Sequence, residues 1–90
     1  MAPPLNPRIT AVQPLRPYLV ALTFTDGSRG VVDLEPWIRR GGEVFGPLQA
    51  PALFAQVRVD PEAGTIVWPN GADLDPDVLF EAAHPARTAT

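Results

Sequence analysis

Residues 18–34, YLVALTFTDGSRGVVDL, decide the fold of this 90-residue chain. Residues 18–24 are rich in β-branched and aromatic side chains and are apolar on both faces, which predicts a central strand. The segment Thr25-Asp26-Gly27-Ser28 follows. Asp-Gly between two strand-like runs is a strong hairpin signal, because glycine adopts a positive φ at little cost. Residues 29–34 supply the return strand, so the stretch predicts an antiparallel hairpin.

Further strands and short helices are expected on both sides of this hairpin. Residues 8–12 alternate, with Ile9 and Ala11 on one face, and Gln13-Pro14 is expected to end that strand. A second hairpin is predicted over residues 56–60 and 65–68, around a turn at 61–64. Short helices are predicted over 35–40, around 52–55 and over 77–83, and a loop over 43–47.

These elements predict one α+β domain over residues 8–83. Its small antiparallel sheet would hold about five strands, formed by two hairpins and an N-terminal strand, and two or three short helices would cover one face. Residues 1–7 are expected to be a flexible leader, and residues 84–90 a flexible tail.

Composition narrows the function classes. The chain has no cysteine, which excludes disulfides, thiolate metal sites and cysteine nucleophiles. Ten acidic residues outnumber seven arginines, and the net charge of −3 opposes direct binding to nucleic acid, whose affinity depends on phosphate neutralisation. No signal peptide and no membrane-spanning run is recognised, so a cytoplasmic protein that does not bind membranes is expected.

Three aspartates alternate in the segment WPNGADLDPDVLFE, residues 68–81. Asp73, Asp75 and Asp77 match the first ligand positions of a calcium loop, but such a loop needs glycine at its sixth position and glutamate at its twelfth. Val78 and His84 stand there instead. The EF-hand interpretation therefore fails.

A helix start explains the same aspartates better. Asp75 suits the N-cap, Pro76 the first helical position, and Asp77 adds favourable charge to the first turn. Asp73 is expected to be an Asx-turn residue or a solvated carboxylate. A small-ligand or divalent-cation site, or an enzyme, using Asp73, Asp75 and Asp77 stays open as the alternative.

Little other chemistry is present. Ser28, the only serine, lies in a turn, and His84, the only histidine, is expected at the C-terminus of a helix. No nucleophile elbow and no phosphate-binding loop occurs. No catalytic residue, metal ligand or cofactor is therefore predicted, and the protein is expected not to be an enzyme.

The residues between 37 and 54 suggest an interaction surface instead. Apolar side chains gather there around a connection rich in glycine and proline, and a domain of this size is not expected to bury them all. We predict Trp37 and Phe45 as partner-binding residues, with Arg39 and Arg40 as their polar rim.

Three segments, LTFTDGSRGVVDL (22–34), GPLQAPALFAQVRVD (46–60) and GTIVWPNGADLDPDVLFE (64–81), together resemble the bacterial family of domain of unknown function 2442. The resemblance covers residues 8–82 and implies a small α+β fold. It also implies that some relatives carry an appended helix-turn-helix domain and that others are encoded beside another small protein, which suggests a toxin–antitoxin pair. It implies no catalytic residues.

The leading hypothesis is a non-catalytic protein-interaction module, the antitoxin-like or regulatory member of a two-protein system. Its partner would be a protein, such as the product of an adjacent gene. A homodimer formed through a free sheet edge is a further alternative.

Overall fold

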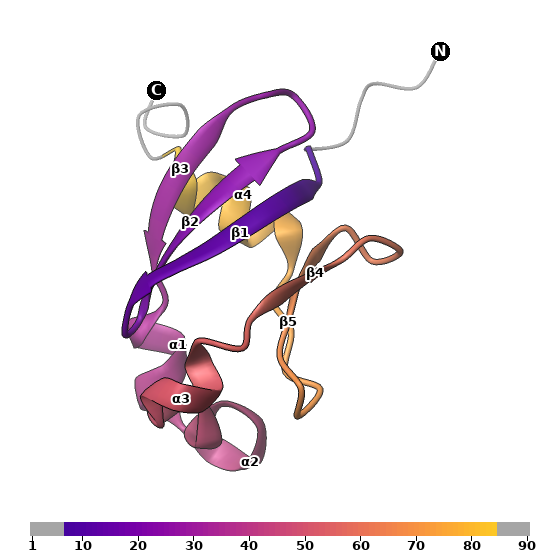
Figure 1. The fold of residues 1–90 in the computed structure, drawn as a ribbon. Coiled ribbons are helices and arrows are strands. Elements are labelled where there is room, and N and C mark those ends of the chain that lie inside the picture. The colour runs from indigo at the N-terminus through magenta and orange to yellow at the C-terminus, as the bar shows by residue number, and fades with distance from the viewer. Residues whose placement is uncertain (1–6, 85–90) are drawn as a thin grey trace.

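The computed structural model describes residues 7–84 and confirms the α+β class (Figure 1). The strands form a three-stranded antiparallel sheet, in the order β1-β2-β3, and a two-stranded sheet, β4-β5. The expected leader and tail lie outside the described residues, except for Pro7 and His84. The elements are β1 (Ile9–Arg16), β2 (Leu19–Phe24), β3 (Arg29–Asp33), α1 (Glu35–Arg40), α2 (Gly42–Phe45), the 3-10 helix η1 (Gly46–Gln49), α3 (Pro51–Phe54), β4 (Arg58–Asp60), β5 (Thr65–Val67) and α4 (Pro76–Ala83).

The predicted hairpin connects β2 to β3, and β2 is the central strand, as expected. Phe24 accepts a hydrogen bond from the backbone N–H of Gly27 at 2.9 Å and donates its own N–H to Ser28 at 2.9 Å. Gly27 has φ +84°, and Asp26 Oδ1 accepts from Ser28 N at 2.9 Å. This three-residue loop requires the left-handed conformation that glycine supplies.

β1 differs from the prediction in its length and in its phase. It continues past Val12 to Arg16 and contains Pro14, which pairs with Val20. Proline is tolerated because β1 is an edge strand, where a missing N–H costs no ladder bond. A register shift between Ile9 and Ala11 reverses the alternation, so Val12, rather than Ala11, shares the inner face with Ile9.

The five strands form two sheets, not the single sheet that was expected. The second hairpin, β4-β5, meets β1 where Ile9 N donates to Gly64 O at 2.9 Å. Further along the outer edge of β1, Pro14 has no N–H to donate, so β4 cannot extend a ladder there. In Figure 1 the β4-β5 ribbon accordingly diverges from the larger sheet.

The segment from 43 to 47, expected as a loop, is helical. Gly46 N donates to Gly42 O within α2, and Asn70 Nδ2 donates to Val44 O at 2.8 Å. The second contact comes from 26 residues away in the sequence, so no local pattern could indicate it. The predicted helices at 35–40 and around 52–55 are confirmed as α1 and α3.

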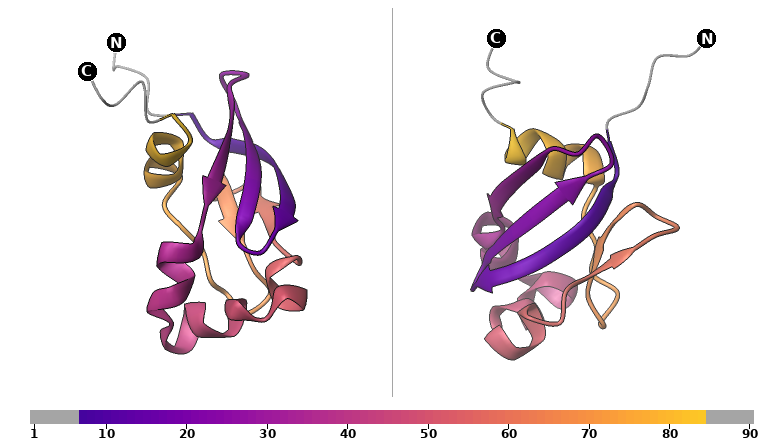
Figure 2. Two further views of the ribbon diagram at one scale, coloured as in Figure 1. Left: turned by 90° about the vertical axis from the view of Figure 1, so that its left-hand side faces the viewer. Right: turned by 45° about the horizontal axis from the view of Figure 1, so that its top comes forward.

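α4 covers one face of the three-stranded sheet, as the two views of Figure 2 show. Its Leu79 and Phe80 are buried, and the Phe80 ring meets Phe24 edge-on with centroids 5.0 Å apart. α4 can approach β3 closely because Gly30 has no side chain: a Cβ there would lie 2.6 Å from the Cβ of Ala83. One face of the sheet is thereby covered by α4, which leaves the opposite face to be considered as a site.

Candidate functional site

The four residues predicted to bind a partner lie on α1 and α2. Trp37 and Phe45 are half-buried and pack against the core, whereas Arg39 and Arg40 are exposed. Arg39 Nε lies 2.6 Å from Glu35 Oε2 in an exposed ion pair, which contributes little stability. The two aromatic side chains are thus part of the core packing, and of the four predicted residues only the two arginines are freely accessible.

A small polar hollow adjoins Arg39. Tyr18, Glu35, Arg39 and Gln49 line it. Tyr18 donates its hydroxyl to Gln49 O at 2.6 Å, and Gln49 Nε2 donates to Ile38 O at 3.1 Å. These bonds tie η1 to α1 and to the start of β2, so the polar groups already have structural partners.

The alternating aspartates begin α4, as the helix interpretation predicts. Asp75 is the N-cap, and its Oδ1 accepts from Asp77 N at 2.8 Å. Pro76 occupies the first turn. Asp73 is exposed, and its backbone forms an isolated bridge with Val67. Within residues 7–84, no three histidine or carboxylate side chains cluster closely enough to hold a metal ion.

Ser28 and His84 form no hydrogen bond with each other in the described part of the chain. The Ser28 hydroxyl donates to Asp26 Oδ1 at 2.6 Å. The His84 Nδ1 lies 2.9 Å from Phe80 O, and its ring lies against the Phe80 ring, tilted by 37°, with centroids 4.4 Å apart. Both residues therefore have the turn and helix-end roles that the sequence predicted for them.

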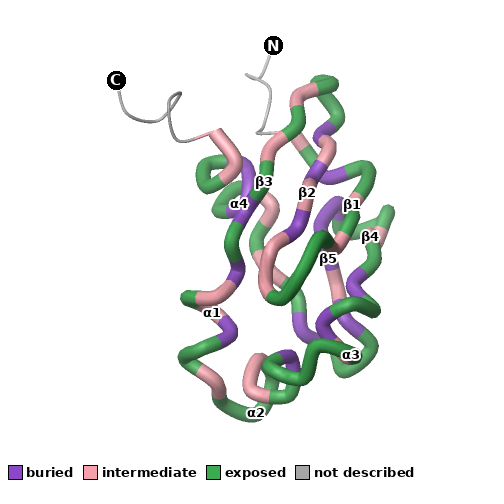
Figure 3. The backbone as a smooth tube through the Cα atoms, turned by 60° about the vertical axis from the view of Figure 1, so that its left-hand side comes forward, coloured by how far each residue is buried: buried purple, intermediate pink, exposed green. Residues whose placement is uncertain are grey.

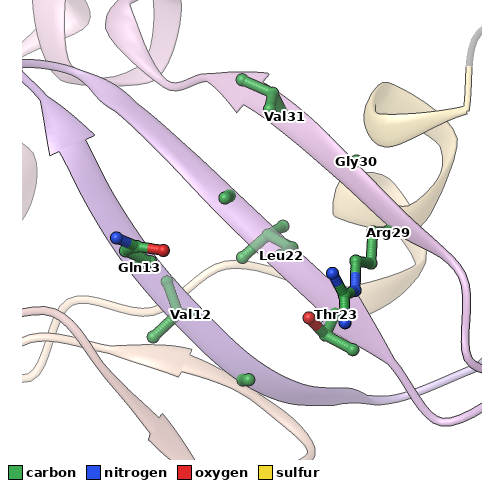
Figure 4. A pocket seen from close by; sticks show the side chains of 9 residues that line it. Val12, Gln13, Leu22, Thr23, Arg29, Gly30 and Val31 are labelled. Carbon is green, nitrogen blue, oxygen red and sulfur yellow. The ribbon is translucent and has the colours of Figure 1, made fainter.

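The surface that the sequence did not reveal is the uncovered face of β1-β2-β3, which we call the open face (Figure 4). A shallow hollow of about 610 Å³ lies on it. Ala21, on the central strand, stands opposite Gln13 of β1 and Val31 of β3. Because alanine is short and its neighbours rise on both sides, the middle of this face is concave.

The open face is largely apolar with a polar margin. Val31 keeps 53% of its surface exposed and lines the hollow. Gln13, Thr23 and Arg29 supply the polar groups around the hollow. Such a surface can bind but has no paired nucleophile and base, so binding is the chemistry it supports best.

The sequence carries a signal for the open face. The run at 18–24 is apolar on both faces, which predicted a central strand, and helices were expected on one face of the sheet only. In the structure β2 alternates between buried and half-buried residues, visible as alternating colours in Figure 3. Leu19 and Ala21 are only half-buried by the described residues. The apolar side chains on that face of β2 therefore form an accessible surface.

No helix within the described residues is both long and apolar enough to cross a membrane.

Comparison with known proteins gives a family and a fold but no established activity. The crystal structure of the "Putative DNA Binding Protein NE0471" from Nitrosomonas europaea superposes with a TM-score of 0.79 at 25% sequence identity. The alignment covers 98% of this chain and 56% of that one, so the present chain spans little more than half of that protein. No curated protein matches the chain.

The model of the family described as "Protein of unknown function (DUF2442)" matches residues 9–85. This range contains every strand and helix of the structure and agrees with the resemblance seen in the three sequence segments. The chain therefore belongs to the DUF2442 family of proteins of unknown function.

Proposed function

We propose that this protein is a non-catalytic interaction module that binds a partner protein through the open face. The observation that carries the proposal is the uncovered apolar hollow around Ala21 on the central strand. Large hydrophobic side chains exposed in the described chain are Leu15, Val31, Val44 and Val78, and Val31 lies on this face. Exposed apolar patches of this kind mark interaction sites in small soluble domains.

The shape of the hollow favours a protein rather than a small molecule. Small-molecule sites enclose most of the ligand surface, whereas this hollow is a shallow depression of a sheet. An apolar middle with Gln13 and Arg29 at its margin resembles the core and rim of a protein interface. The net charge of −3 makes direct nucleic-acid binding the less favourable alternative.

The α1–α2 corner is a second candidate surface for the same partner. Arg39 and Arg40 are exposed there, and Val44 keeps 45% of its surface accessible. Trp37 and Phe45 would contribute only their accessible edges, because both pack against the core. The open face is preferred because its middle is apolar and its side chains do not fill the core.

Within this class, we propose the regulatory or antitoxin-like role in a two-protein system, with a partner encoded nearby. Because the chain carries a net charge of −3, a partner with a basic surface would be electrostatically complementary to it. Co-expression tests this finer proposal: a neighbouring gene product that arrests growth alone and not in the presence of this protein would support it. A neutral neighbour would count against it.

The experiment for the module itself is capture of the partner, followed by calorimetry with the purified pair. Ala21→Arg fills the hollow with a long charged side chain and is expected to abolish binding. Arg58→Asp, an exposed substitution on β4, is the matched control and should bind as the wild type does. Circular dichroism verifies that each variant is folded.

A second pair of variants, Trp37→Ala and Phe45→Ala, locates the site if the open face is not involved. Loss of binding in these variants, with Ala21→Arg unaffected, would move the interface to the α1–α2 corner. Normal binding by all three would refute both surfaces.

A further inference from the structure

β3 is an edge strand, and the hydrogen-bonding groups on its outer side have no strand partner within residues 7–84. In the described chain it pairs with β2, and no strand lies along its other side (Figure 1). Leu34 N donates to Tyr18 O at 2.8 Å, and Phe24 N donates to Ser28 O at 2.9 Å. Along an antiparallel strand, the backbone N–H and C=O groups of successive residues point to alternate sides. These two bonds therefore mean that the backbone groups of the even-numbered residues of β3 point toward β2. The backbone N–H and C=O groups of Arg29, Val31 and Asp33 therefore point away from the sheet.

The side chains of these three residues share one surface. All three are exposed and lie on the open face, whereas Gly30 and Val32 face α4 and the core. Val31 stands in the middle, with Arg29 two residues before it and Asp33 two residues after it. The strand thus presents a positive charge, an apolar centre and a negative charge, at equal spacing.

We propose that β3 pairs with β3 of a second copy of this chain in an antiparallel ladder centred on Val31. In that register Arg29 stands opposite Asp33 of the second copy, and Asp33 opposite its Arg29. Val31 meets its own counterpart on the two-fold axis. Every outward-pointing residue is then in a hydrogen-bonded pair, which completes six backbone hydrogen bonds by the antiparallel geometry.

The charges select this register over its neighbours. A shift by two residues in either direction places Val31 opposite a charged side chain. It also leaves one of the three residues facing the turn at 25–28 or the start of α1. Only the centred register places opposite charges across the interface at both ends, and directly opposite charges stabilise a strand pair whereas like charges destabilise it. The sequence of β3 is therefore complementary to itself.

The dimer would join two three-stranded sheets into one of six strands. The two open faces would become one continuous surface, while both copies of α4 would lie on the other face. The proposal does not rest on the partner-binding function, because the ladder is formed by the backbone edge of β3, although Arg29 and Val31 also line the hollow around Ala21. Failure of one leaves the other standing.

Sedimentation velocity of purified variants tests the pairing. The wild type is expected to sediment as a dimer of twice the 9.7 kDa chain. Arg29→Asp and Asp33→Arg each place two like-charged pairs across the interface, so each alone is expected to weaken dimerisation by roughly tenfold to a hundredfold. Mixing the two variants restores both opposite-charge pairs, and the mixture is expected to regain the wild-type dimer.

Charge changes elsewhere provide the control. Arg58→Asp and Asp73→Arg alter the same charges at exposed positions away from β3, and each should dimerise as the wild type does, alone and mixed. A monomeric wild type would overturn the proposal and would make Arg29 and Asp33 charges that protect a free edge. Dimeric single variants, or a mixture that stays monomeric, would also overturn it.

A second measurement avoids the risk that Asp33→Arg misfolds, since Asp33 Oδ1 accepts from Glu35 N at 2.9 Å and helps to begin α1. Amide hydrogen exchange of the wild type should show protection of Arg29, Val31 and Asp33 that falls on dilution. Val31→Arg, at an exposed position, should remove that protection and leave Val32 protected. Exchange that is fast at all concentrations would refute the ladder.

Discussion

Replacing Gly30 with alanine tests how α4 is held against the sheet. Gly30 lies on β3, and the Cβ of an alanine there would lie 2.6 Å from both the Cβ and the carbonyl O of Ala83. Non-bonded carbon atoms prefer separations of about 3.5–4.0 Å, so helix and strand would have to move apart by about 1 Å. Neither obstructing atom is the end of a flexible side chain, so the backbone itself must yield.

The expected cost follows from what that movement disturbs. α4 places Leu79 and Phe80 in the core, and a gap of about 1 Å forfeits up to half of the dispersion energy of the contacts that it opens. Overpacking of this kind typically costs about 1–3 kcal/mol, and we expect about 2 kcal/mol for Gly30→Ala. For a domain of this length that lowers the Tm by about 8–16 °C.

Urea denaturation followed by tryptophan fluorescence measures the loss, and Gly46→Ala is the control. Gly46 also has a negative φ, and a Cβ there would meet its nearest atoms at an ordinary 3.8 Å. That variant is expected to be neutral or slightly more stable. Equal stabilities of the two variants would refute the close packing of α4 on β3.

Three further predictions concern other parts of the structure. Asp75→Ala should lower the free energy of unfolding by about 1 kcal/mol, because it removes the hydrogen bond that caps Asp77 N. The control Asp73→Ala should change that free energy by less than about 0.5 kcal/mol. Equal losses in urea denaturation would contradict the capping role. Trp68→Phe should cost about 2–3 kcal/mol in the same assay, because the buried indole N–H donates to Phe54 O at 3.0 Å, and a negligible loss would argue against that bond. Fluorescence anisotropy with duplex DNA at about 150 mM salt should show no binding by this acidic chain, and a saturable, salt-sensitive signal would favour a DNA-binding role instead.

Features that depend on a few neighbouring residues could be predicted from the sequence. Asp26-Gly27 predicts the β2-β3 turn because glycine is the residue that adopts the required positive φ. Asp75-Pro76-Asp77 predicts the start of α4 because the cap, the missing N–H and the charge all act within one turn. The two hairpins and the α+β class follow from such local rules.

The candidate site depends on contacts between distant residues, and these could not be predicted. Local alternation placed Ala11 with Ile9, but the register shift in β1 reverses the phase. The helical turn at Val44 is held by Asn70, 26 residues further along.

The sequence by itself determined the turns, the caps and the apolar character of β2. Only the tertiary structure decided which side of β2 would be buried. α4 covers one face of the sheet because Gly30 lets Ala83 approach β3, and residues 53 positions apart must meet before that choice is made. The apolar pattern of β2 is compatible with a second face that is covered or open. The β propensity of the individual residues does not distinguish the two cases.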